Sequence, residues 1–311
     1  MSERFGAVVT GWGSALPDKV VTNADLAVRL DTTDEWIVAR SGIRERRIGG
    51  TTGALAAEAG RRALASADVE PSSVELVVLA TTTPDRTMPA TASSVQDALG
   101  TGGGAFDVNG ACAGFVYALL AGFGLAGIGA RRVLVIGADV MSTIVDQDDR
   151  GTAVLFGDGA GAVLLDAVAG PGRLLGWDTG SDGSAEHLLY ADLGSSTVME
   201  GKEVFRRAVR VMADSASAAL GRAGVGAEDV DLLVPHQANA RIIEAACSRL
   251  GIGLDRTALV LEHTANTSAA SIPLALVASV EAGRLHPGDL VVLVGFGAGL
   301  TWASAVLRWG P

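Results

Sequence analysis

Short apolar runs recur along the first half of the chain and alternate with longer segments rich in small residues. The runs at residues 74–81 (VELVVLAT) and 133–139 (VLVIGAD) are almost unbroken by polar side chains. Runs of this kind are typical of parallel strands covered on both faces, because each face then lies against apolar neighbours. Two further strands are predicted at residues 5–13 and 154–165, so the pattern indicates an α/β protein.

Helices are predicted between these strands. Residues 53–67 are rich in alanine, residues 91–99 are predicted to be helical, and Thr22 is placed to cap a short helix. Residues 106–130 predict a short strand, a tight glycine turn and a long helix without charge after Asp107. This helix approaches the length of a bilayer span. It is glycine-rich, however, and two arginines and a strand follow it at once, so we expect it to be buried inside the protein.

The second half of the chain repeats the first. Residues 63–81 align without a gap on residues 219–237, and residues 134–137 correspond to 292–295 at a similar offset. The longer pair predicts a helix, a turn and a buried strand in both halves. In a duplicated α/β unit, loops that follow equivalent strand ends can meet at one site. The two predicted halves are residues 1–168 and 169–311.

Composition narrows the possible functions. The 311 residues are 49% apolar and 19% charged with a net charge of −11, so neither a disordered chain nor a general nucleic-acid-binding protein is expected. Cys112 and Cys247 are not part of a CxxC pair, so they predict neither a disulfide framework nor a metal site. The first residues lack the basic and apolar regions of a signal peptide. We therefore expect a soluble cytoplasmic protein.

A glycine-rich run at residues 157–163 (GDGAGAV) invites comparison with a nucleotide-binding fingerprint. That fingerprint needs its glycines between a strand and a helix, where the backbone approaches the pyrophosphate. Here the glycines interrupt a strand-like run. They therefore indicate a bend or close packing and not a nicotinamide site.

Cys112 is the first candidate for a catalytic residue. It stands where the turn between Gly110 and Gly114 is predicted to become the long helix. A thiol there faces unpaired backbone N–H groups and the positive end of the helix dipole. Both are expected to favour the thiolate, which is the nucleophilic form. The alternative interpretation is a small buried apolar residue in a core helix.

The duplication supplies partners for this cysteine. The repeat offset places Asn266, in ANTSAAS, close to the position equivalent to Cys112, and it places His236, in VPHQAN, just past a buried strand. Taken singly, His236 could be a core histidine and Asn266 a helix cap. Together they predict a pocket where a cysteine, a histidine and an asparagine converge from three strand–helix junctions.

Several segments together resemble the thiolase-fold β-ketoacyl-acyl-carrier-protein synthase III family over nearly the whole chain. They are DTTDEWIVARSGIRERR, NGACAGF, DRGTAVLFGDGAGAV, MEGKEVFRRAV, VPHQAN, ANTSAAS and GFGAGLTWASAVLRW. The resemblance implies a duplicated thiolase fold with five αβαβα layers, a homodimer, and a triad of Cys112, His236 and Asn266. An asparagine as third member is the pattern of the priming class. Elongating ketosynthases carry two histidines, and thiolases carry a second cysteine that residues 295–300 lack.

The same resemblance implies the chemistry. Cys112 would take an acyl group from acyl-CoA while the backbone N–H groups of Cys112 and Ala298 hold the oxyanion. The acyl-enzyme would then condense with malonyl-acyl-carrier protein in a decarboxylative Claisen reaction, which initiates fatty acid or polyketide synthesis. His236 Nε2 and the Asn266 amide would donate to the enolate oxygen. No tightly bound cofactor is implied, because acyl-CoA is a substrate.

The family pattern also assigns residues around the triad. Those expected to bind CoA are Trp36, Arg40, Arg150, Gly201 and Asn239. Those expected to form the acyl pocket are Phe296 and a Met88 that reaches across from the partner subunit. Those expected to receive the acidic carrier protein are Arg206, Arg241 and Arg249. Without the resemblance, Trp36 fits a half-buried anchor as well as a surface for a ligand ring, and the arginines fit ordinary solvated surface.

Some positions depart from the family pattern. Ala265 precedes the triad asparagine where glycine is usual, Gly110 stands where alanine is often found, and Ala298 and Leu300 interrupt the last glycine turn. The segment 181–199 is shorter than in housekeeping enzymes. These departures leave the acyl substrate open, so a natural-product starter ketosynthase or acyltransferase is an alternative. A thioester hydrolase with the same triad is another, whereas a non-catalytic scaffold would normally lose the cysteine.

Overall fold

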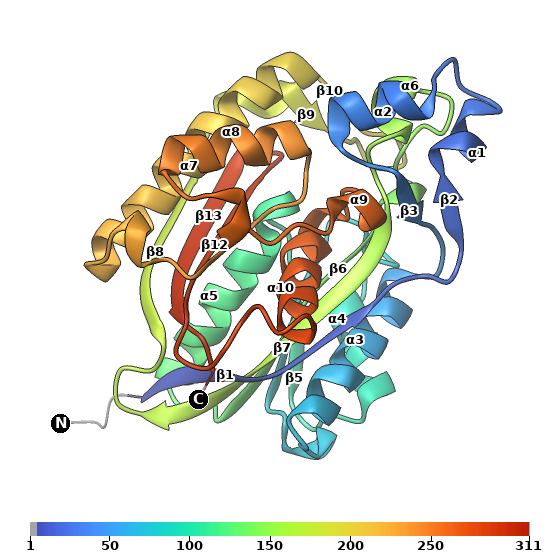
Figure 1. Ribbon diagram of the computed structural model, residues 1–311. Coiled ribbons are helices and arrows are strands. Elements are labelled where there is room, and N and C mark those ends of the chain that lie inside the picture. Colours follow the sequence, from blue (N-terminus) through green and yellow to red (C-terminus); the bar gives the residue numbers. More distant parts are fainter. Residues whose placement is uncertain (1–4, 311) are drawn as a thin grey trace.

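Two β-sheets lie on either side of a pair of central helices, and further helices cover their outer faces (Figure 1). The computed structural model describes residues 5–310. From one side to the other, the layers are α3 with α4, the first sheet, α5 with α10, the second sheet, and α7 with α8. The five-layer α/β fold expected from the sequence is therefore confirmed.

The first sheet has five strands in the order β1–β7–β6–β4–β5. The parallel strands are β4 (Leu76–Ala80), β5 (Gly104–Val108) and β6 (Arg132–Val140). β7 (Asp158–Ala169) runs antiparallel to β6 and to β1 (Phe5–Ala15). β4 lies between two parallel neighbours, as its unbroken apolar run predicts.

The second sheet has the order β11–β12–β13–β8. β11 (Leu232–Pro235) is parallel to β12 (Leu290–Gly297), and β13 (Thr301–Arg308) and β8 (Leu174–Ser181) continue the sheet in antiparallel fashion. The strand directions along β11–β12–β13–β8 are the same as those along β4–β6–β7–β1 in the first sheet. The helix–strand pairs α3–β4 and α7–β11 arise from the two segments that align without a gap. The division at residue 168 stays a prediction.

The layered helices differ in how much of their surface is buried. They are α3 (Thr52–Ser66), α4 (Thr91–Leu99), α5 (Gly114–Gly127), α7 (Gly201–Ala223), α8 (Ala240–Leu250) and α10 (Ser271–Glu281). α5 and α10 are mostly buried between the sheets, which confirms the buried helix predicted after Cys112. Among residues 5–310, no helix combines the length and apolar character needed to cross a bilayer.

Short elements gather at one end of the layers (Figure 1). They are β2 (Val20–Thr22), α1 (Asn23–Ala27), α2 (Asp34–Ser41), β3 (Glu45–Arg47), α6 (Arg150–Ala153), β9 (Leu189–Tyr190), β10 (Val198–Met199) and α9 (Leu261–Thr264). Thr22 caps α1 together with Asp25, as predicted. Several of these elements contribute walls to the site described below.

The glycine run in β7 allows close packing. A Cβ atom placed on Gly161 would lie 2.7 Å from the Pro273 side chain at the start of α10. Real Cβ atoms do not approach other heavy atoms so closely, so glycine is what lets α10 lie directly on β7. The interpretation of this run as a packing feature is confirmed.

Candidate active site

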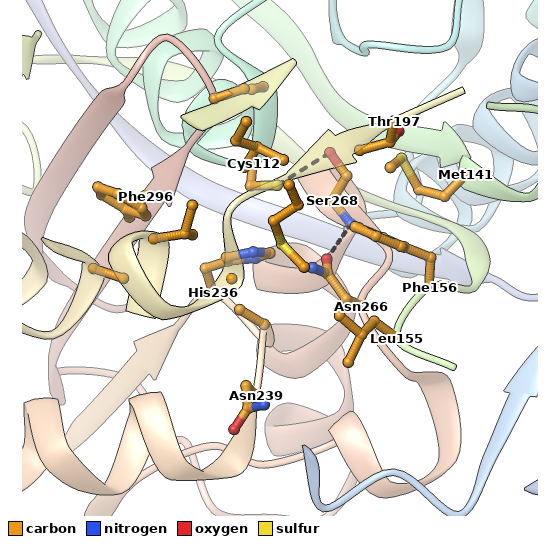
Figure 2. Close-up of a pocket in the computed structure, with 18 of the residues that line it drawn as sticks. Cys112, Met141, Leu155, Phe156, Thr197, His236, Asn239, Asn266, Ser268 and Phe296 are labelled. Atoms are coloured by element: carbon orange, nitrogen blue, oxygen red, sulfur yellow. Dashed lines mark hydrogen bonds between the residues drawn. The ribbon is translucent and has the colours of Figure 1, made fainter. Parts of the chain in front are cut away.

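A single cavity of about 660 Å³ brings the three predicted catalytic residues together. Cys112, His236 and Asn266 all line it, with Phe296 and Ala298 beside them. Figure 2 shows the three side chains directed into the same space from separate segments. The volume lies in the usual range for small-molecule sites, and most of the lining is apolar. A thioester with an acyl chain is a ligand that suits such a cavity.

Close contact with β12 fixes the position of Cys112. The cysteine lies in a 3-10 turn, Ala111–Ala113, here called the Cys112 turn, between β5 and α5. A Cβ atom on Gly297 would lie 2.5 Å from Cys112 N, and one on Gly295 would lie 2.8 Å from Ala113 Cα. The glycines of β12 therefore let this turn rest on the end of the strand.

The protonation state expected for Cys112 is wrong. The structure places the cysteine before α5, which begins at Gly114, and the thiol is buried at the back of the cavity. Burial raises the pKa of Cys112 to about 12, and this effect outweighs the hydrogen bond from its sulfur to the Ser268 hydroxyl, which lowers the pKa. In the absence of substrate, the group is therefore a thiol.

His236 is held in one orientation by a serine. The histidine follows β11, and its backbone N–H donates to Val294 O at 2.8 Å, which extends the pairing with β12. Its Nδ1 lies 2.6 Å from Ser271 Oγ, which also accepts the Gln237 backbone N–H at 3.3 Å. Among residues 5–310, no other acceptor faces this hydroxyl, so its proton is assigned to the bond with Nδ1. The histidine proton then lies on Nε2.

The imidazole is neutral in this environment. Burial lowers the pKa of His236 to about 3. A neutral ring with its proton on Nε2 can donate one hydrogen bond without bringing a positive charge into the cavity. Together with the thiol form of Cys112, this leaves both of these predicted catalytic side chains uncharged in the absence of substrate.

Asn266 is fixed by the backbone on both sides. Its N–H donates to Leu155 O at 2.9 Å, and its carbonyl accepts the Gly157 N–H at 3.0 Å. The side-chain Oδ1 accepts the Ser268 N–H at 2.9 Å. Because Oδ1 is engaged, the amide nitrogen is turned toward His236 (Figure 2). Asn266 Nδ2 and His236 Nε2 can therefore donate to one oxygen.

The residue before this asparagine has an unusual backbone. Ala265 has φ +56° and ψ −162°. This region is almost restricted to glycine, because a Cβ atom there crowds the backbone. The conformation explains why glycine is the usual residue at this position in the family pattern.

Sequence reasoning missed the residues that hold the triad. Ser268 lies 3.5 Å from Cys112 Sγ through its hydroxyl, and Ser271 contacts His236. Asp139, at the end of β6, is fully buried and accepts the Ala269 N–H at 2.9 Å. The two serines stand in the ANTSAAS motif, at the start of an apolar helix, which was an available signal. Nothing in the sequence pairs Asp139 with residue 269.

The residues expected to bind the nucleotide of CoA meet at the cavity mouth. The guanidinium groups of Arg40 and Arg150 lie over the Trp36 ring at 4.2 and 4.8 Å from its centroid. Trp36 is half-buried, which confirms the anchor interpretation, and it lines the cavity, while its role as a surface for a ligand ring stays a prediction. Asn239 caps α8, donates to Arg40 O at 2.8 Å, and lies apart from the triad in Figure 2. Gly201 also lines the cavity.

The acyl-pocket residues divide between the cavity and the outer surface. Phe296 is buried and lines the cavity, whereas Met88 is 82% exposed and is not among the lining residues of this protomer. The segment 181–199 supplies part of the wall through Leu189, Tyr190 and Thr197. It is therefore a boundary of the cavity and not only a surface loop.

The basic positions expected to receive a carrier protein do not all meet. A separate surface groove is lined by Arg206, Arg207, Val209, Arg210 and Arg249. Three of these arginines pair with acids: Arg206 with Glu203, Arg207 with Glu203 and Asp182, and Arg249 with Asp214. Arg241 lies elsewhere, with its guanidinium 5.7 Å from the ring of Phe205 in the cavity wall. Within the described part of the chain, no three histidine, cysteine or acidic side chains gather as a possible metal site.

Comparisons with known proteins agree along the whole chain. A family model for 3-oxoacyl-[acyl-carrier-protein] synthase III matches residues 106–183, and a model for the C-terminal part of the same family matches residues 220–309. A β-ketoacyl-[acyl-carrier-protein] synthase III from Erythrobacter litoralis is 50% identical, with 97% of this chain and 99% of that protein covered. Another, from Bacillus pumilus, is 45% identical over 98% of this chain and 100% of that protein.

Solved structures give the same result. The 3-oxoacyl-[acyl-carrier-protein] synthase III of Aquifex aeolicus has a TM-score of 0.95 at 43% identity, covering 98% of this chain and 100% of that one. The priming β-ketosynthase of the R1128 polyketide biosynthetic pathway has a TM-score of 0.94 at 37% identity, covering 100% of this chain and 98% of that one. These likenesses extend through both sheets and both central helices.

Proposed function

Because the chain belongs to the 3-oxoacyl-[acyl-carrier-protein] synthase III family and is a condensing acyltransferase of that class, we propose how its residues divide the reaction. Cys112 takes an acyl group from acyl-CoA. The acyl group then condenses with malonyl-acyl-carrier protein in a decarboxylative Claisen reaction that initiates fatty acid or polyketide synthesis. The observation that carries this proposal is the convergence of Cys112, His236 and Asn266 on one cavity.

In the first half-reaction, Cys112 Sγ attacks the thioester carbonyl carbon. The bond from that carbon to the CoA sulfur breaks, and the thiol proton ends on the departing CoA sulfur. The backbone N–H groups of Cys112 and Ala298 hold the oxyanion. Burial raises the pKa of Cys112 to about 12. The cysteine therefore loses its proton only as negative charge develops on the carbonyl oxygen of the attacked thioester.

In the second half-reaction, the malonyl group loses CO₂ and its electrons move onto the thioester oxygen. His236 Nε2 and Asn266 Nδ2 donate to that enolate oxygen. The carbanion attacks the acyl carbonyl on Cys112, the bond from that carbon to Sγ breaks, and the departing thiolate takes a proton from water. The neutral histidine, whose pKa burial lowers to about 3, suits a donor that must not add charge before decarboxylation.

The CoA nucleotide is proposed to stack at Trp36. The ring already carries Arg40 and Arg150 at 4.2 and 4.8 Å, so an adenine that enters between Trp36 and Arg150 must move the arginine outward. The guanidinium groups would then face the phosphates. Asn239 and Gly201 line the path between this end and Cys112.

A second copy of the chain is proposed to complete the acyl pocket. β5 is an edge strand of the first sheet, and its Phe106 is 37% exposed. An uncovered edge is open to pairing with a second copy about a twofold axis. Met88, which is 82% exposed, would then reach the cavity of the partner. Short primers such as acetyl, propionyl or isobutyryl groups fit a pocket closed in this way.

Met88→Trp tests whether Met88 closes the far end of the partner's acyl pocket. The larger ring should fill the far end of the pocket, so acylation by isobutyryl-CoA should fall by about tenfold or more relative to acetyl-CoA. Cys112 acylation across a chain-length series, followed by intact mass, gives the ratio. Ile128→Trp is the matched control, because Ile128 is also exposed but follows the far end of α5. A wild-type ratio in the Met88 variant would remove Met88 from the pocket.

The arginine groove is proposed to receive the acidic carrier protein. Arg206, Arg207, Arg210 and Arg249 present four cations around one hollow, and the acids that pair with them are Asp182, Glu203 and Asp214. Surface cations arranged in this way raise the rate of encounter with an acidic partner. Arg241, whose guanidinium lies near Phe205 of the cavity wall, would meet the carrier protein near its prosthetic arm.

One assay tests the proposed function. The protein is incubated with a panel of acyl-CoAs and its mass is measured; malonyl-acyl-carrier protein is then added. We expect a mass increase equal to one short acyl group on Cys112, followed by its loss and by the appearance of a β-ketoacyl-carrier protein. Release of free acid instead would identify a hydrolase. Equal turnover of malonyl-CoA and malonyl-carrier protein would contradict the role of the arginine groove.

A further inference from the structure

The two halves of the molecule carry two copies of one backbone turn. The Cys112 turn follows Asn109, whose Oδ1 accepts the Ala111 N–H at 3.2 Å. The second copy, Ser268–Ala270, here called the Ser268 turn, follows Asn266, whose Oδ1 accepts the Ser268 N–H at 2.9 Å. The residues that donate these bonds, Ala111 and Ser268, have φ +47° and +50°, which is unusual for residues other than glycine. Each turn leads into a central helix.

This match agrees with the expectation that Asn266 lies close to the position equivalent to Cys112, and it gives the residue-by-residue equivalence. Asn266 corresponds to Asn109, and the counterpart of Cys112 is Ala269. Each turn also rests on a glycine of a central strand. A Cβ atom on Gly137 in β6 would lie 2.4 Å from Ala269 O, and one on Gly295 in β12 would lie 2.8 Å from the Cys112 turn.

Strand registers show which residues of β6 and β12 correspond. Leu76 of β4 pairs with Val133, and its aligned counterpart Leu232 of β11 pairs with Val291. Counting along the two strands from these pairs matches Gly137 with Gly295, and it matches Asp139 with Gly297.

The two copies differ at that last position. Asp139 Oδ2 accepts the Ala269 N–H at 2.9 Å. At the other copy, Gly297 adjoins the Cys112 N–H, which finds no acceptor in another residue among residues 5–310. We propose that Asp139 permanently fills the anion-holding position of one turn, whereas Gly297 leaves the same position open at Cys112 for the substrate oxygen. This inference rests on the proposed role of Cys112 as nucleophile.

Asp139 is therefore a positioning residue for the active site. Its Oδ1 accepts hydrogen bonds from the backbone N–H groups of Thr82 and Thr83 and from the hydroxyls of Thr81, Thr82 and Thr83. Its Oδ2 holds the Ser268 turn through Ala269. The carboxylate thus ties the end of β4 to the segment that carries Asn266 and Ser268, and it sets their distance from Cys112.

The charge on Asp139 also acts on the thiol. Burial is the main cause of the raised pKa of Cys112; the Ser268 hydroxyl opposes it, and the Asp139 carboxylate adds to it. His236 is the other titratable group that faces Cys112, and burial keeps it neutral. Removing the Asp139 charge should therefore lower the pKa of Cys112.

Asp139→Asn tests both consequences. An amide has one acceptor oxygen: if it serves Ala269, the NH₂ group faces the Thr82 and Thr83 N–H groups, and the reverse orientation leaves the Ala269 N–H unpaired. We expect condensation by the preformed acyl-enzyme to fall by about 10²-fold through misplaced donors. We also expect the pH profile of Cys112 alkylation by iodoacetamide, followed by peptide mass mapping, to move to lower pH.

A shift of the alkylation profile by about half a pH unit is sufficient to be measured, because it changes the thiolate fraction of Cys112 about threefold at pH values well below the pKa. Asp158→Asn is the matched control. Asp158 is also fully buried, and it accepts hydrogen bonds from Gly49 and Ser142 but none from the Ser268 turn. Its variant should lose stability while keeping the wild-type alkylation profile and condensation rate. An unmoved profile together with unchanged condensation in Asp139→Asn would overturn the proposal.

A second variant tests the same proposal if Asp139→Asn does not fold. Thr82→Val removes one hydroxyl donor from the carboxylate at nearly constant volume. With less of the charge compensated, the alkylation profile should move to higher pH, and a move to lower pH would contradict the proposal. Acylation that persists in Cys112→Ser would instead remove the proposed nucleophile, which is a separate failure.

Discussion

Cys112→Ser is expected to abolish acyl-enzyme formation, with a fall in acylation rate of at least about 10³-fold. A hydroxyl is a much weaker acid than a thiol, and the burial that raises the pKa of Cys112 to about 12 penalises an alkoxide in the same way. The turn itself should be unchanged, because its position depends on contacts with the glycines of β12. Intact mass after incubation with acetyl-CoA measures the effect.

Cys247→Ser is the control for this variant. Cys247 is buried away from the cavity, and its sulfur lies 3.4 Å from Thr257 Oγ1, a contact that serine can keep. This variant should acylate at the wild-type rate. Iodoacetamide should also label Cys112 faster than Cys247, with a rate that rises about tenfold per pH unit because the thiol pKa lies far above neutrality. Labelling of Cys247 alone would defeat the assignment.

His236→Ala and Asn266→Ala should each reduce malonyl decarboxylation by about 10² to 10³-fold, which is the usual effect of losing one donor to a developing oxyanion. Acylation of Cys112 should be much less affected, because the enolate oxygen exists only in the second half-reaction. Release of CO₂ from malonyl-carrier protein and acyl-enzyme formation are measured separately for each variant.

Asn266→Asp makes this test sharper. The aspartate keeps an oxygen for the Ser268 N–H, so the turn retains its contact at Oδ1. It cannot donate to the enolate and adds a like charge beside it, so decarboxylation should fall further than in the alanine variant. Variants that decarboxylate normally but fail to acylate would show that the roles given to His236 and Asn266 are wrong.

Local sequence patterns predicted much of the fold because their causes are local. Unbroken apolar runs became β4 and β6, each buried in the first sheet. The gap-free repeat became the same helix–strand pair on both sides of the molecule. Cys112, His236 and Asn266 were identified because each follows or precedes a predicted strand or helix end, and such ends meet in a duplicated fold.

The protonation of the site was not predictable in this way. The helix dipole is a property of the segment that contains Cys112, and it favours a thiolate. Burial of the thiol depends on β12 and on the Ser268 turn, which lie more than 150 residues away in the chain. Their packing decided that the resting group is a thiol, because the loss of solvation outweighs the hydrogen bonds with Ser268 and the backbone that lower the pKa of Cys112.

The sequence by itself determined the α/β class, the duplicated order of elements and the choice of the three residues proposed as catalytic, because hydrophobic period and motif spacing are properties of the linear chain. The tertiary structure alone decided which groups hold those residues in place. Asp139 meets the Ala269 N–H across 130 residues, and Ser271 meets His236 across 35. Such contacts exist only after the two sheets have stacked on α5 and α10, and no local pattern encodes a distance between layers.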